Sequence, residues 1–205
     1  MARSLSLRIL SLAGVLITLS VAGLLSSPWV QAQERGIGRY DVPPPGFEWH
    51  SCDVIECSFL VPEGWAFQRL QDSKLGGTVL QYRMVPKMDI GKTSPVVRIN
   101  IIQKTKFTTG LSAQRHIDLF VRQLDREGKI LDLWKNKSKL LQSTAVMSLN
   151  YSRLQQPVKK FNLLVHNDRT DTLYVLSFES KTDDWDKNWQ MIEQIVTRLR
   201  LAENV

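Results

Sequence analysis

Three histidines, His50, His116 and His166, are the residues that could supply acid–base or metal chemistry. A zinc site needs several ligands that converge on one point, and a catalytic triad needs a nucleophile beside its base. None of the histidines has a second ligand at metal spacing, and the chain has no nucleophile-elbow, P-loop or dinucleotide-binding motif. We therefore predict no catalytic residue, no metal site and no cofactor. The chain is not expected to be an enzyme, and a secreted hydrolase is disfavoured.

Acidic residues gather at Asp183, Asp184 and Asp186, where they could in principle hold a hard cation. A carboxylate in the first turn of a helix also accepts from free backbone amides and complements the helix dipole. Because an amphipathic helix is expected to start here, we interpret these acids as capping residues. Asp168 and Asp171 lie in a run of turn-forming residues and are interpreted as turn residues.

The two cysteines of the chain are Cys52 and Cys57. A redox-active pair is one interpretation, but the spacing is not C-x-x-C and no thioredoxin-like strand and helix surround it. In an oxidising compartment, an even number of cysteines favours a disulfide. The sequence thus predicts a structural Cys52–Cys57 disulfide, which stabilises the fold by about 2 kcal/mol on chain-entropy grounds.

The first 32 residues have the pattern of a signal peptide. Arg3 and Arg8 precede an apolar run over 9–25, and Val30-Gln31-Ala32 offers the small residues that a signal peptidase reads. We predict that residues 1–32 are cleaved near Ala32 and that the protein is exported, either periplasmic or secreted. An uncleaved anchor is the alternative, because the apolar run approaches the shortest length that spans a bilayer.

The charge balance of the chain is basic. It carries 27 Lys and Arg against 20 Asp and Glu, a formal net charge of +7. Removal of Arg3 and Arg8 with the leader leaves 25 basic and 20 acidic residues, or +5. This excess favours an acidic partner or an anionic membrane surface. Nucleic acid is not expected as a partner of an exported protein.

Residues 33–46 are predicted to be a Pro- and Gly-rich linker, since Pro43-Pro44-Pro45-Gly46 enforces an extended chain. The remainder, 47–205, is predicted to be a single domain. Its strands are indicated by apolar–polar alternation and by β-branched or aromatic runs. They are expected within 58–61, 65–67, 78–85, 97–101, 130–141, 145–151, 161–165 and 173–178.

Two amphipathic helices are also expected. The first is capped by Ser112, carries an apolar stripe over 113–124, and is predicted to end at Gly128 in the left-handed conformation. The second has one apolar face. That face comprises Trp185, Trp189, Ile192, Val196 and Leu199.

The run Leu173–Phe178 is apolar, aromatic and β-branched throughout, which is typical of a central strand covered on both faces. Strands that follow one another through short turns must mostly pair antiparallel. The sequence therefore predicts an α+β fold, a mostly antiparallel sheet with two amphipathic helices packed on it.

Two stretches carry a resemblance to the PsbP-like and DcrB-like proteins, which have an α/β/α-layered fold. Phe59-Leu60-Val61-Pro62-Glu63-Gly64-Trp65 is similar to the opening strand and turn of that family, and Tyr174–Phe178 with the helix over 185–199 is similar to its close. The resemblance covers about 47–201 and implies non-enzymatic binding, assembly or chaperoning of partner proteins, often at membranes. Bacterial members commonly carry a lipid-anchor cysteine at the cleavage site, where this chain has Ala32-Gln33.

Lys135, Lys137 and Lys139 alternate along the chain, so in an extended segment all three project from one side. With Leu131 and Leu133 expected to face the core, the strand should run past the edge of the core into these lysines. They could simply be charges that protect a sheet edge from aggregation. The sharper hypothesis is a cationic surface that docks an anionic membrane or an acidic protein.

The function expected from the sequence is an exported, non-catalytic binding or assembly module that acts on protein partners at the cell envelope or a membrane surface. The alternative is a small-ligand or lipid-binding protein that uses a cleft between the sheet and a helix.

Overall fold

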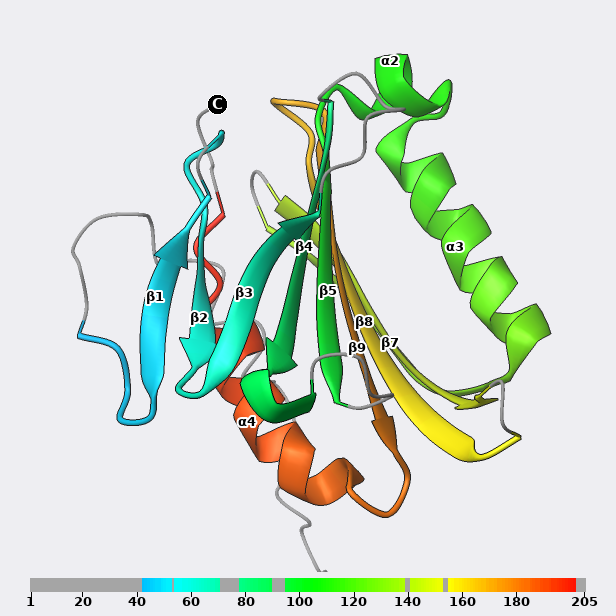
Figure 1. Cartoon of the computed structure of the whole chain (residues 1–205). Helices are drawn as coiled ribbons and strands as arrows, with labels where there is room; N and C mark the ends of the chain where they lie inside the picture. Colours follow the sequence, from blue (N-terminus) through cyan, green and yellow to red (C-terminus); the bar gives the residue numbers. More distant parts are fainter. Residues whose placement is uncertain are drawn as a thin grey trace, which may run out of the picture.

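The computed structural model describes residues 42–52, 54–70, 78–89, 95–138, 141–152 and 155–201 (Figure 1). The predicted leader and residues 33–41 of the predicted linker lie outside the described residues. The strands are β1 (Phe47–Ser51), β2 (Ser58–Pro62), β3 (Trp65–Leu70), β4 (Val79–Pro86), β5 (Val96–Ile102), β6 (Lys129–Lys137), β7 (Leu141–Tyr151), β8 (Pro157–Asn167) and β9 (Thr172–Lys181). The helices are α2 (Thr105–Thr109), α3 (Ala113–Glu127) and α4 (Trp185–Thr197), with a 3-10 turn η2 (Lys87–Asp89).

Seven of the strands form one sheet in the order β3-β4-β5-β9-β8-β7-β6, and β1 and β2 form a separate two-stranded sheet. Every pairing between neighbouring strands is antiparallel. The strand β9 lies at the centre of the large sheet, and its residues 172–176 are all buried. The predicted central strand and the predicted α+β class are both confirmed.

The two long helices cover opposite faces of the seven-stranded sheet (Figure 1). On one face, Tyr174, Leu176 and Phe178 of β9 share a core with α4. On the other face, Leu173 and Val175 share a smaller core with α3. Because side chains alternate along a strand, β9 supplies both cores at once. The short helix α2 is a third helix that the sequence pattern did not predict.

The two predicted helix starts differ in how they are capped. The Ser112 side chain accepts a hydrogen bond from the Arg115 amide at 3.3 Å, so the predicted N-cap of α3 is confirmed. The N-cap of α4 is Asp184, whose side chain makes no capping hydrogen bond. Within the described part of the chain, no helix is long and apolar enough to cross a membrane.

Gly128 does end α3, but the predicted left-handed conformation is wrong. Its φ is −171° and its ψ is −162°, which is extended backbone. A Cβ at this position would collide with the carbonyl oxygen of Leu149 and with the Asn150 side chain, 2.8 Å away. Glycine is therefore needed here because β7 passes close to the chain, and not for its access to positive φ.

The prediction that Leu131 and Leu133 face the core is also wrong. The two side chains are 42% and 41% exposed. The register between β6 and β7 shifts between Ile130 and Asp132, so Leu131 falls in an irregularity of the ladder. Moreover β6 is an edge strand, and only Ile130 among its side chains packs on the core beneath α3.

The β1–β2 hairpin packs beside α4. An isolated bridge joins it to Arg200, in the segment that follows α4. The Ser58 amide donates to the Arg200 carbonyl at 2.9 Å, and the Arg200 amide donates back at 3.2 Å. The Arg200 guanidinium lies 3.7 Å from the centroid of the Trp49 ring. Next to this hairpin, Cys52 and Cys57 lie at disulfide distance, with Cα atoms 5.5 Å apart, within the range that the predicted bond requires.

Candidate functional site at the α2 end of the sheet

One row of paired residues crosses five strands at the end of the sheet nearest α2. Its members, from β5 through β9, β8 and β7 to β6, are Ile102, Leu173, His166, Gln142 and Lys137. Residues that pair directly across an antiparallel sheet project from the same face. Ile102 and Leu173 belong to the core beneath α3, so the whole row faces the α3 side. The row is apolar at β5 and β9 and polar at β8, β7 and β6.

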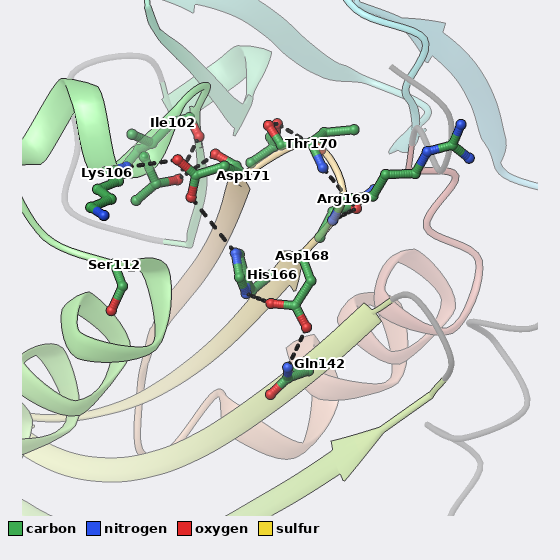
Figure 2. Close-up of polar contacts among 12 residues, drawn as sticks. Ile102, Lys106, Ser112, Gln142, His166, Asp168, Arg169, Thr170 and Asp171 are labelled. Carbon is green, nitrogen blue, oxygen red and sulfur yellow. Dashed lines mark hydrogen bonds and ion pairs between the residues drawn. The ribbon is translucent and has the colours of Figure 1, made fainter.

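His166 is the centre of a polar network in this row (Figure 2). Its side chain is only 9% exposed, and its Nδ1 lies 3.1 Å from Oδ1 of Asp168. Its Nε2 lies 3.9 Å from Oδ1 of Asp171 and is buried without a hydrogen-bond partner. Gln142 donates its Nε2–H to the second oxygen of Asp168. The network thus places one imidazole between two carboxylates.

Burial lowers the pKa of His166 below its usual value of 6.5, while the charges of Asp168 and Asp171 oppose this shift. The ring is therefore neutral at neutral pH. Since Nδ1 faces a carboxylate oxygen, it carries the proton and donates to Asp168. The lone pair of Nε2 then points toward the Asp171 carboxylate. A hydrogen bond between Nε2 and Asp171 would require a second proton on the ring, at Nε2.

Asp171 also fastens α2 to the end of the sheet. Its carbonyl accepts from the Thr105 amide at 2.7 Å and from the Thr105 hydroxyl at 2.9 Å, and its side chain accepts from the Lys106 amide at 2.9 Å. The Thr105 hydroxyl also contacts the Ile102 carbonyl, at 3.1 Å, and Thr105 is fully buried. We call these contacts between Asp171 and Thr105–Lys106 the α2 clamp.

Two residues of the α2 clamp region have left-handed backbone. Asp171 has φ 50° and Lys104 has φ 46°. A non-glycine residue pays a conformational cost in this region, and such a conformation persists only where surrounding contacts enforce it. The hydrogen bonds of the α2 clamp supply that enforcement.

The chemistry available at this network is limited. In the described part of the chain, no three His, Cys, Asp or Glu residues gather as a metal site would require. The nearby hydroxyl of Ser112 is used as the α3 cap. The arrangement can hold or move a proton at Nε2 of His166, and it can position α2. The sequence placed Asp168 and Asp171 in a turn but did not predict that they flank His166, because that depends on the left-handed backbone of Asp171.

The other two histidines are separate from this network. His50 of β1 contacts Glu48, with Nε2 and Oε1 2.9 Å apart, and this contact lowers the pKa of Glu48. His116 lies on α3, where burial lowers its pKa. The three histidines therefore do not converge on one site.

Of the lysines predicted as a partner surface, Lys135 and Lys137 are exposed on β6, and Lys139 lies outside the described residues. They pair with Thr144 and Gln142 of β7, so both project on the α3 side. Exposed apolar side chains adjoin them. We call the following set the β6 edge surface: Leu131, Leu133, Trp134, Lys135 and Lys137.

Side chains of both long helices pack closely on the sheet, in the region of the alternative ligand cleft. Ile192 and Ile195 of α4 are fully buried against one face of the sheet. Trp185 and Trp189 stack on each other with centroids 5.4 Å apart, and Trp189 meets the edge of Phe161 at 5.0 Å. Beneath α3, Ile117 is 2% exposed. The interpretation of the two tryptophans as core residues is supported by these contacts.

Comparisons with known proteins find similarity in three-dimensional structure. No protein-family model matches the chain, and no curated protein matches it in sequence. The chain is similar to cyanobacterial PsbP (CyanoP) from Synechocystis sp. PCC 6803, with a TM-score of 0.47, 11% identity, and coverage of 81% of this chain and 99% of that chain. It is also similar to PA94, a protein of unknown function from Pseudomonas aeruginosa, with a TM-score of 0.38, 7% identity, and coverage of 72% and 94%. One of these two solved structures is a PsbP protein, and the DcrB-like resemblance stays a prediction.

Proposed function

We propose that the chain is an exported, non-catalytic binding or assembly module that acts on a protein partner at the cell envelope or a membrane surface. The observation that carries this proposal is the β6 edge surface. The disulfide distance between Cys52 and Cys57 supports the exported part, because disulfides persist in oxidising compartments.

The β6 edge surface combines exposed lysines with exposed apolar side chains, and an edge strand that only faces water needs no such combination. Lysines alone would discourage strand-to-strand aggregation. Leu133 and Trp134, at 41% and 37% exposure, instead add apolar area beside those lysines. They lie on opposite faces of the strand, because Leu133 pairs with Val146 and Trp134 with Ala145. An added strand could therefore contact apolar side chains on both of its faces.

The charges favour an acidic partner over a second copy of this chain. Lys129, Lys135 and Lys137 are exposed on β6, against Asp132 as the one acid of this strand. Two copies joined through β6 would bring lysines against lysines. An extended, acidic segment would place carboxylates there instead and would gain the backbone pairing of an eighth strand.

The test is affinity capture from the native cell envelope with paired charge variants. The Lys135→Glu/Lys137→Glu variant and the Trp134→Ala variant should each lose a partner that the parent retains and that salt releases. The Lys181→Glu/Lys187→Glu variant makes the same change of charge at exposed lysines of β9 and α4 and should keep the partner.

Thermal melting of each variant checks that the fold survives. Equal capture by the parent, both β6 variants and the control would contradict the proposal, since the captured protein would then bind elsewhere or nonspecifically.

A further inference from the structure

The short helix α2 presents an apolar ring to solvent beside two cations. Phe107 is 86% exposed, which is unusual for so large an apolar side chain. Lys104 and Lys106 are exposed as well. We call Lys104, Lys106 and Phe107 the α2 tip; it lies at one end of the sheet, beyond the end of β5 (Figure 1).

The α2 tip is held in place and is not a loose loop. Thr105, between its two lysines, is fully buried and joined to Asp171 and Ile102 by the α2 clamp. The Thr108 and Thr109 hydroxyls donate to the carbonyls of Gln103 and Thr105, each at 2.7 Å. Lys104 and Asp171 keep their strained left-handed backbone in this turn because the surrounding hydrogen bonds enforce it. The left-handed residues Lys104 and Asp171 are therefore part of the turn that holds Phe107 at the surface.

Lys104 and Lys106 place positive charge on the outer surface at this end of the sheet. Asp171 is turned toward His166 and the Lys106 amide, and Asp168 toward His166 and Gln142 (Figure 2). The ammonium groups of Lys104 and Lys106 form no ion pair with another described residue. The outward surface therefore carries an aromatic ring beside two cations, while the carboxylates of Asp168 and Asp171, 56% and 40% exposed, are turned toward His166.

A lipid surface fits this arrangement better than a protein groove does. One side chain is far less than the area that a specific protein interface buries. A bilayer needs no complementary shape, accepts a single ring at the level of its headgroups, and attracts lysines when its lipids are anionic. We propose that the α2 tip docks on an anionic membrane, with Phe107 inserted among the headgroups and Lys104 and Lys106 beside lipid phosphates.

This docking rests on the proposed function only in placing the protein at a membrane surface, and it requires no protein partner. In this orientation the end of the sheet meets the lipid. The β6 edge surface lies on the edge strand, four strands away from β5. Its Lys137 belongs to the same end of the sheet, whereas Leu131, Leu133 and Trp134 lie farther along the strand and stay open to a protein.

The test places an environment-sensitive fluorophore at position 107 of the full chain. With Cys52 and Cys57 paired, Phe107→Cys supplies a single thiol for the label. A Met88→Cys chain is the matched control, because Met88 is 90% exposed and follows a lysine, Lys87. Met88 lies in η2, after the last residue of β4, whereas Val79 at the start of β4 pairs with Ile102 near α2. The control label is therefore at the opposite end of the sheet from the α2 tip. Both labels are carried by the same full chain, so binding through the apolar leader affects both signals, and the difference between positions 107 and 88 reports on the α2 tip.

Vesicles of phosphatidylcholine with phosphatidylglycerol should move the label at 107 into an apolar environment, and salt should reverse the shift. Pure phosphatidylcholine should not produce it, and the label at 88 should stay aqueous. Lys104→Asn and Lys106→Gln should each weaken the vesicle affinity about fivefold. Asparagine is chosen at 104 because it tolerates the left-handed backbone.

Three results would overturn the proposal. One is a label at 107 that stays aqueous on anionic vesicles. Another is an equal loss of affinity in Lys135→Gln/Lys137→Gln, which would mean attraction by total charge. The last is a shift at 107 caused by lipid-free envelope proteins and not by vesicles, which would assign the α2 tip to a protein groove. The vesicle assay contains no partner protein, so its outcome is separate from that of the capture experiment.

Discussion

The two faces of the seven-stranded sheet are covered by different kinds of side chain. On the α4 side, aromatic rings interlock: Phe178 lies 5.4 Å from Trp185, which stacks on Trp189. On the α3 side the core is smaller and aliphatic, with members such as Ile117 and Leu164. Toward α2 that second core gives way to the polar row of Gln142 and His166. The α4 side therefore carries the larger buried core, whereas the α3 side leaves one end of the sheet to the polar network that positions α2.

The largest expected loss is on the α4 side. Trp185 is 4% exposed, so Trp185→Ala should lower the free energy of unfolding by about 3–5 kcal/mol. Trp189 is only partly buried, and Trp189→Ala should cost less. Denaturant unfolding of both variants measures the difference. If Trp189→Ala proved the more damaging, the stack would depend on the outer ring and not on the buried one.

A smaller loss is expected on the α3 side. Ile117→Ala removes a side chain that is 2% exposed from an aliphatic core and should cost about 2–3 kcal/mol. The same denaturant titration applies. A loss as large as that of Trp185→Ala would remove the contrast between the two faces.

The α2 clamp should contribute less still. Thr105→Val removes the hydroxyl that contacts the carbonyls of Ile102 and Asp171, and it should cost about 1–3 kcal/mol. Thr105→Ser keeps the hydroxyl and should restore most of the loss. Hydrogen exchange of the amides of α2 should accelerate in Thr105→Val but not in Thr105→Ser. Unchanged exchange would show that the backbone bonds of Asp171 suffice.

The mildest effect is a dependence on pH that belongs to the α3 side. Burial lowers the pKa of both His116 and His166 in the folded chain, so between that lowered pKa and 6.5 the unfolded chain binds more protons. Stability from these groups is complete above 6.5 and is lost as the pH falls through the folded pKa. The facing carboxylates of Asp168 and Asp171 moderate the loss at His166. His166→Gln should flatten the pH dependence of the denaturation midpoint; an unaltered slope would exclude His166 as a source.

The parts of the fold that the sequence predicted are those with long periodic patterns. The buried strand over 173–178 and the stripes of α3 and α4 repeat over many residues, so packing and local pattern agree. Ser112 was also identified, because an N-cap is a local signal. The α+β class follows from these elements and the short turns between them.

The features that the sequence did not predict depend on contacts between distant segments. Gly128 is required by the approach of β7, and Leu131 is displaced by an irregularity against β7. The helix α2 has too few residues to show a period, and it is fixed by Asp171 of the β8–β9 turn. The polar network around His166 likewise exists only once β7, β8 and that turn have come together.

The bridge between Ser58 and Arg200 has a consequence for timing. The β1–β2 hairpin comprises the first two strands of the described residues, and an isolated two-stranded hairpin is at best marginally stable. Its second strand is fastened by backbone bonds to Arg200, whose guanidinium also covers Trp49. The backbone bridge to residue 58 can therefore form only after Arg200 has been made, whereas Phe59 contacts Phe67 of β3, which lies only a few residues further along the chain.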